Sequence, residues 1–62
     1  MKKRYEVWAH NKYSGWKLDS MTDSLSVAKR QFNQLVKSAE WLPTYDQFKV
    51  VDTKIMLLIC VY

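Results

Sequence analysis

The side chains best suited to chemistry in this 62-residue chain are one histidine, His10, and one cysteine, Cys60. A nucleophile needs a base within reach, but Cys60 lies inside an apolar run and His10 lies at the end of an aromatic, β-branched segment. This pattern favours a small hydrophobic role for Cys60 and a turn-side position for His10. The carboxylates are scattered singly, and Asp19 and Asp23 suit a turn and a helix cap. One His and one Cys cannot make a zinc site alone. We therefore predict a non-enzymatic protein with no catalytic residues, metal or cofactor.

Positive charge is concentrated at the start of the chain. The formal net charge is +4, and residues 1–17 alone account for it, with five basic side chains against Glu6. Aromatic side chains alternate with these cations, an arrangement that suits base stacking and phosphate contact on a sheet. One hypothesis is therefore a nucleic-acid interface formed by Lys2, Lys3, Arg4, Lys12, Tyr13, Trp16 and Lys17. The competing interpretation is that the net charge only keeps a small protein soluble.

The first element that the sequence predicts is a β-hairpin. Residues 4–21 are rich in aromatic and β-branched types on either side of turn-forming residues 11–15. The preferred register pairs Val7 with Leu18, because it groups the most apolar residues on one face. A register one residue longer pairs Trp8 with Leu18 instead.

A helix follows the hairpin. Apolar residues recur at offsets of three, four and seven from Leu25 to Ala39, several N-capping residues precede them, and Pro43 follows. Trp41 and Leu42 are expected to fold back onto the core. Basic residues on the polar face of this helix lie on a different layer from the first hairpin, which weakens the nucleic-acid hypothesis.

A second hairpin completes the domain. Residues 46–52 and residues 55–62 read as strands around a short turn, with Val50 expected opposite Leu57 and Val51 opposite Met56. The order strand, strand, helix, strand, strand predicts a single α+β domain over residues 1–62. We expect two layers, a four-stranded, mainly antiparallel sheet with one helix packed on one face.

The position of the last strand determines which side chains lie on the face of the sheet that the helix leaves uncovered. Its unbroken apolar run is typical of a strand covered on both faces, so we predict a central position beside the first strand, with the second and third strands as edges. Leu57, Ile59 and Val61 would then face the helix. The opposite, open face would display Cys60 and a set of partner-binding or dimer-binding residues, Trp8, Lys49, Val51, Met56, Leu58 and Tyr62. In the alternative interpretation, Trp41, Leu42 and Tyr45 wrap round and cover part of that face.

The small size of the chain makes an uncovered face costly. A domain of this length buries only about 60% of the surface of its unfolded chain, and small domains compensate with disulfides, metals or association. A single cysteine excludes an internal disulfide. We therefore expect either a homodimer through the open face or docking onto another protein with an acidic or apolar surface.

Nothing in the sequence indicates insertion into a membrane. The apolar run at residues 55–62 is far shorter than the roughly 20 residues needed to span a bilayer. The basic start is followed directly by an alternating segment, without the apolar stretch of a signal peptide. We therefore expect a cytoplasmic protein that does not enter a membrane.

The layout of four short segments resembles a known class of proteins. These segments are residues 5–8 (YEVW), residues 15–20 (GWKLDS), residues 28–30 (AKR) and residues 48–52 (FKVVD). The chain resembles the short reading frames of bacteriophages and mobile elements, which include anti-CRISPR and other host-defence inhibitors. That resemblance implies a stoichiometric inhibitor that occupies a surface of a host or anti-phage defence complex in the bacterial cytoplasm.

Overall fold

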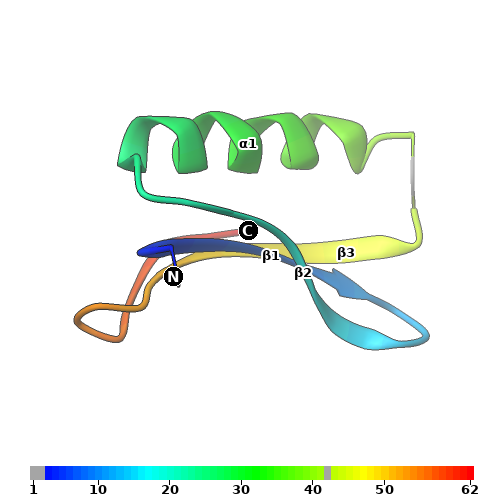
Figure 1. The fold of residues 1–62 in the computed structure, drawn as a ribbon. Helices are drawn as coiled ribbons and strands as arrows, with labels where there is room; N and C mark the ends of the chain where they lie inside the picture. Colours follow the sequence, from blue (N-terminus) through cyan, green and yellow to red (C-terminus); the bar gives the residue numbers. More distant parts are fainter. Residues whose placement is uncertain (1–2, 42) are drawn as a thin grey trace.

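The computed structural model describes residues 3–41 and 43–62. The elements along the chain are β1 (Tyr5–Asn11), β2 (Gly15–Thr22), α1 (Leu25–Ser38), β3 (Tyr45–Asp52) and β4 (Leu57–Val61). The four strands form one antiparallel sheet, and α1 lies across one of its faces (Figure 1). The predicted α+β fold, with its order of two strands, a helix and two strands, is confirmed.

Local chemistry explains where these elements begin and end. The Asn11 side chain accepts hydrogen bonds from the backbone N–H groups of Tyr13 and Ser14, and Gly15 has a φ of +86°, so the first hairpin turns sharply at residues 12–14. The hydroxyl of Ser24 accepts a bond from the N–H of Val27 and caps the start of α1. The helix thus begins at one of the predicted capping residues.

The strand order differs from the prediction. The sheet runs β2-β1-β3-β4, so β1 and β3 are central and β4 is an edge strand, whereas we expected the last strand at the centre and the third at an edge. The physical reason is burial: β1 and β3 alternate buried residues with half-buried ones, whereas β4 has no buried residue. A continuous apolar run therefore did not mark a doubly covered strand.

The register of the first hairpin also differs. Trp8 lies opposite Leu18, as in the longer register, and a bulge then places Val7 opposite Ser20. The preferred pairing of Val7 with Leu18 is therefore wrong. Because directly opposed residues share a face, Leu18 lies with Trp8 on the side of the sheet away from α1.

The register of the second hairpin is wrong as well. Residues 53–56 form a four-residue turn in which Met56 has a φ of +53°, so the strand starts only at Leu57. Val50 lies opposite Cys60 and Val51 opposite Leu58, with a bulge between these pairs. Cys60 consequently packs towards the core and not on the open face. Leu57 and Val61, expected in the core, are 53% and 67% exposed.

The core lies between α1 and the two central strands. Val7 and Val50 are fully buried and meet Ala28 of the helix. Partly buried side chains complete this cluster: Leu25, Phe32, Leu35, Ile59 and Cys60. Trp41 is 76% exposed and does not fold back onto the core, contrary to expectation. Leu42 lies outside the described residues.

The pair Arg4–Asp52 fastens β1 to β3. Arg4 donates from Nε and Nη2 to the carboxylate of Asp52 at 2.9–3.1 Å, and Asp52 also accepts from the N–H of Lys54 at 3.0 Å. The Asp52 side chain is only 3% exposed, whereas that of Arg4 is 40% exposed. The hydrogen bond from Arg4 lowers the pKa of Asp52 against the opposing effect of burial.

This pair predicts a loss of stability in acid. A carboxyl with a depressed pKa stabilises the fold above its unfolded pKa of about 3.9, and this contribution is lost as the pH falls through the folded pKa. The unfolding free energy from urea titration should therefore drop below about pH 4. Asp52→Asn should lower stability at neutral pH and flatten this acid dependence.

Asp23→Asn is the matched control. Asp23 pairs with Lys3 at 3.6 Å on the surface, where both side chains are more than half exposed, so its loss should change stability little. An acid profile that is the same for Asp52→Asn and the unaltered chain would contradict the assigned role of Asp52.

Candidate binding surface

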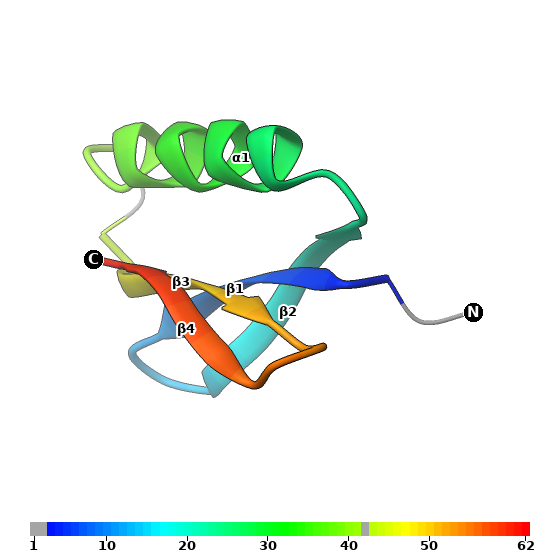
Figure 2. The ribbon, with the colours of Figure 1, turned by 90° about the vertical axis from the view of Figure 1, so that its left-hand side faces the viewer.

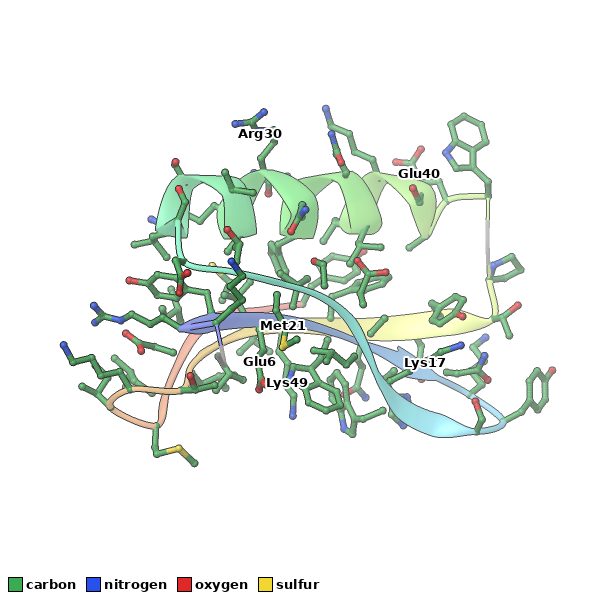
Figure 3. The ribbon with its side chains drawn as sticks, viewed as in Figure 1. Glu6, Lys17, Met21, Arg30, Glu40 and Lys49 are labelled. Atoms are coloured by element: carbon green, nitrogen blue, oxygen red, sulfur yellow. The ribbon has the colours of Figure 1, made fainter. Side chains whose placement is uncertain are left out.

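The face of the sheet opposite α1 is built from three rows of side chains, which we call the open face. Residues directly opposite one another across the four strands share a face, so the pairings define the rows. From β2 to β4 the first row is Leu18, Trp8, Lys49 and Val61; the second is Met21, Glu6, Val51 and Leu58; the third, from β2 to β3, is Trp16, His10 and Gln47. Figure 3 shows Glu6, Met21 and Lys49 on the side of the sheet away from α1.

No element in the described residues covers this face. Seen along the sheet and again after a quarter turn, α1 lies on one side only (Figures 1 and 2). The helix packs against β1, β2 and β3 from that side. In the described part of the chain, the open face is therefore left without a covering layer.

A cation held between two aromatic rings lies near the centre of the open face. The Nζ atom of Lys49 lies 4.2 Å from the ring centroid of Trp16 and 5.8 Å from that of Trp8. These distances allow cation–π attraction. Trp8 also donates from Nε1 to the Glu6 carboxylate at 3.3 Å, so an acidic side chain lies beside the same aromatic cluster.

His10 extends this cluster towards the start of β3. Its ring meets Trp16 edge-on, with centroids 5.1 Å apart, and its Nδ1 lies 2.6 Å from Oδ1 of Asp46. The hydrogen bond with His10 lowers the pKa of Asp46, with burial acting in the opposite direction. Asp46 is placed there by the bulge between His10 and Asn11 in the pairing of β1 with β3.

Exposed apolar side chains are concentrated at the β4 edge of the sheet. Among the described residues ten large hydrophobic side chains are exposed, and six of them lie in residues 55–62, which we call the apolar segment. Their exposure ranges from 50% to 81%. The six are Ile55, Met56, Leu57, Leu58, Val61 and Tyr62. This segment comprises β4, part of the preceding turn and the residue that follows the strand.

The structure places four of the six predicted partner-binding residues on the open face: Trp8, Lys49, Val51 and Leu58. Met56 instead lies in the turn before β4. Tyr62 exchanges two backbone hydrogen bonds with Phe48 and packs its ring 6.0 Å from that of Phe48, on the helix side. Tyr45 does not cover the open face either, because it lines a hollow on the helix side.

The residues proposed to bind nucleic acid do not form one surface. Lys3 and Arg4 are paired with carboxylates, and Lys12 and Tyr13 lie at the tip of the first hairpin. Trp16 is on the open face, whereas Lys17 lies opposite Ala9 and lines the hollow of about 360 Å³ between α1 and the sheet. Lys2 lies outside the described residues.

Sequence reasoning missed several members of the open face. Leu18 and Val61 were expected on the helix-facing side because both hairpin registers were misjudged, and Met21 was assigned to neither face. The rejected longer register of the first hairpin contained the signal for Leu18, since it pairs that residue with Trp8. Val61 had no such signal, because it depends on the bulge in β4.

Comparison with known proteins finds no matching family model, no matching curated protein and no matching solved structure. Within residues 3–41 and 43–62, no three His, Cys, Asp or Glu side chains come together as metal ligands. In the same residues no helix is long and apolar enough to cross a membrane. The case for a function therefore depends on the two surfaces described above.

The lysine between the two tryptophans should make a measurable contribution. Lys49→Met keeps most of the aliphatic length but removes the charge, so we expect a loss of about 0.5–1 kcal/mol in unfolding free energy and a changed tryptophan emission. Lys54→Met, at an exposed turn position, is the control and should leave both unchanged. Equal results for the two variants in urea titrations would contradict the cation–π assignment.

Proposed function

We propose that this chain is a small non-catalytic protein-binding module that uses the open face and the adjoining apolar segment. The observation that carries the proposal is the concentration of six exposed large hydrophobic side chains in residues 55–62. Exposed apolar patches mark interaction sites, and Leu58 and Val61 of this segment extend the apolar part of the open face to its edge.

The energy of this exposure supports the proposal. Fully burying a large apolar side chain stabilises by about 1.5–3 kcal/mol, and these six side chains are half exposed or more, so covering them is worth on the order of 5 kcal/mol. A chain of this length has a total stability of about 3–9 kcal/mol. A partner that covers the apolar segment would therefore change the stability of the protein substantially.

The rest of the open face suits a contact surface. Trp8 and Trp16 are large, rigid side chains of the type that dominates binding energy, and Lys49 between them supplies a positive charge for an acidic partner. Glu6 and Asp46 provide acceptors at the margins. The chemistry fits a protein surface that is apolar with some acidic groups.

The target that agrees with this surface and with the resemblance to phage reading frames is a host or anti-phage defence complex. A domain of 62 residues that offers a binding face would act stoichiometrically, by occupying a surface of that complex in the bacterial cytoplasm. This proposal needs no catalytic group, and it assigns the working role to residues on one side of the sheet.

The decisive variant is Leu58→Glu. Leu58 is 50% exposed on the open face beside the edge, so a carboxylate there should weaken both association through the open face and binding of the apolar dye 1-anilinonaphthalene-8-sulfonate. Light scattering and dye fluorescence measure the two effects. The helix signal in circular dichroism should persist, because Leu58 is not part of the core.

Tyr13→Glu is the control for this experiment. Tyr13 is 87% exposed at the tip of the first hairpin, so the same charge placed there should change neither association nor dye binding. A wild-type chain that stays monomeric and binds no dye would refute the proposed function. Loss of all folded structure in Leu58→Glu would instead place Leu58 in the core.

A second candidate function is binding of single-stranded nucleic acid. The specific observation in its favour is Trp16, which is 40% exposed and has the ammonium of Lys49 over its ring, so a base could stack beside a phosphate contact. The ion pairs of Lys3 and Arg4 count against it, because they leave less free charge for phosphates.

Salt dependence tests this second candidate. Binding of a single-stranded oligonucleotide should weaken steeply with salt, with a slope of about −0.7 in log K against log salt for each phosphate contacted. Trp16→Ala should cost about 1–3 kcal/mol if a base stacks there, and Trp41→Ala, at the exposed end of the helix connection, should cost nothing. Weak oligonucleotide binding whose affinity changes neither with salt nor with either substitution would exclude this function.

A further inference from the structure

The outer edge of β4 offers main-chain groups, which the proposed function, argued from side chains, leaves unused. β4 ends the order β2-β1-β3-β4, so in the described chain no strand pairs with its outer side. An edge strand carries unpaired N–H and C=O groups that another strand can bond. Figure 2 shows β4 at the near side of the sheet, below α1.

The hydrogen bonds within the sheet identify which peptide groups face outwards. Phe48 and Tyr62 donate to each other at 3.1 and 2.9 Å, so this pair is a hydrogen-bonded one. In an antiparallel ladder the neighbouring pair, Lys49 with Val61, is then not hydrogen-bonded. The N–H and C=O of Val61 therefore point away from β3, towards the open edge.

The side chains at this edge do not resist pairing with another strand. Soluble proteins protect their edges with charged residues, proline or bulges. The strand β4, Leu57–Val61, contains no charged residue and no proline, and its bulge lies before Val61. Apolar side chains flank the edge on both faces of the sheet, so the occupant must be a strand that is apolar on both faces. A second copy of β4 meets this requirement.

The distribution of charge favours the same occupant. Residues 55–62 carry no charged side chain, so two copies of β4 would bring no like charges together on the paired strands. The basic side chains of residues 1–17 all lie outside β4.

We propose that two copies of this chain associate through the edges of their β4 strands. The strands run antiparallel about a two-fold axis perpendicular to the sheet, and the outward peptide groups of Val61 on each copy bond to β4 of the partner copy. Such an axis keeps both helices on one side of a continuous eight-stranded sheet and joins the two open faces on the other. The dimer therefore leaves the Trp8–Lys49–Trp16 cluster of each copy free for the target.

This inference depends on the proposed function but differs from the homodimer through the open face that the sequence suggested. In a face-to-face dimer the open faces would cover each other, and the protein would have no aromatic surface left for a target. In the edge dimer, association and target binding use different parts of the molecule. The two arrangements predict different effects on the dimer when a main-chain N–H of β4 is removed.

Val61→Pro tests the main-chain bond. Proline removes the outward N–H of Val61, and an edge strand tolerates it because that N–H makes no bond within the sheet. Val61→Ala is the control, since it shortens the side chain but keeps the N–H. We expect light scattering to show a dimer for the wild type and for Val61→Ala, and a monomer with unchanged circular dichroism for Val61→Pro.

Cross-linking of the native cysteine gives a second reading that needs no substitution. Cys60 packs on the helix side of the sheet, so the edge dimer places the two Cys60 side chains on the same side of adjacent strands. A short bis-maleimide should join them. In a face-to-face dimer both sheets, about 10 Å apart, would lie between the two thiols, and the short reagent should not reach.

The outcomes separate the two proposals. A dimer that survives Val61→Pro, or a wild-type dimer whose Cys60 thiols react with the short reagent but are not joined by it, overturns the edge pairing. If Leu58→Glu still abolishes that dimer, the protein-binding function stands and the second copy lies on the open face. A wild-type monomer that binds the dye through Leu58 also overturns the edge pairing, while the protein-binding function survives. If Val61→Pro fails to fold, the cross-linking result decides.

Discussion

The constraint on which this structure depends is the shortage of cover for its sheet. The single helix has 14 residues and is therefore about 21 Å long, enough to pack over β1, β3 and part of β2. All the fully buried side chains lie between that helix and the central strands. The opposite face and the edge at β4 have no cover in the described residues, and the exposed apolar residues follow directly from that deficit.

The ion pair of Arg4 and Asp52 shows how the chain fixes its strand order within this limit. The two residues are 48 positions apart, and their bonds hold the start of β1 against the end of β3. Thr53 adds a backbone bond to the carbonyl of Arg4 at 2.8 Å. Burying a carboxylate is costly unless it is paired, so this contact favours one neighbour for β1 over the alternatives. The central position beside β1, predicted for the apolar last strand, is thus occupied by β3.

The sequence could predict the local elements but not their long-range pairing. The helical period from Leu25, the capping residues and the turn residues Asn11 and Gly15 act over a few positions, and each appears as expected. The strand order depends on which strands bury their side chains against the helix and on the contact between Arg4 and Asp52, and no local pattern reveals either. The registers depend on the turn at residues 53–56 and on two bulges, and a one-residue slip moves every later side chain to the other face. Hence Trp8, Lys49, Val51 and Leu58 lie on the open face as predicted. Tyr62, expected on the open face, lies on the helix side, and Val61, expected on the helix side, lies on the open face.

The two edges of the sheet explain why uncovered surface need not mean indiscriminate association. β2 carries the charged side chains Lys17 and Asp19, so it resists pairing with another strand. β4 lacks charge and turns the peptide groups of Val61 outwards, so it accepts one. In the proposed dimer each β4 edge is consumed by pairing with its copy, so association would stop at two copies, with the β2 edges at the ends of the enlarged sheet. The same asymmetry leaves the aromatic and lysine side chains of the open face as the surface on which a different protein can be recognised.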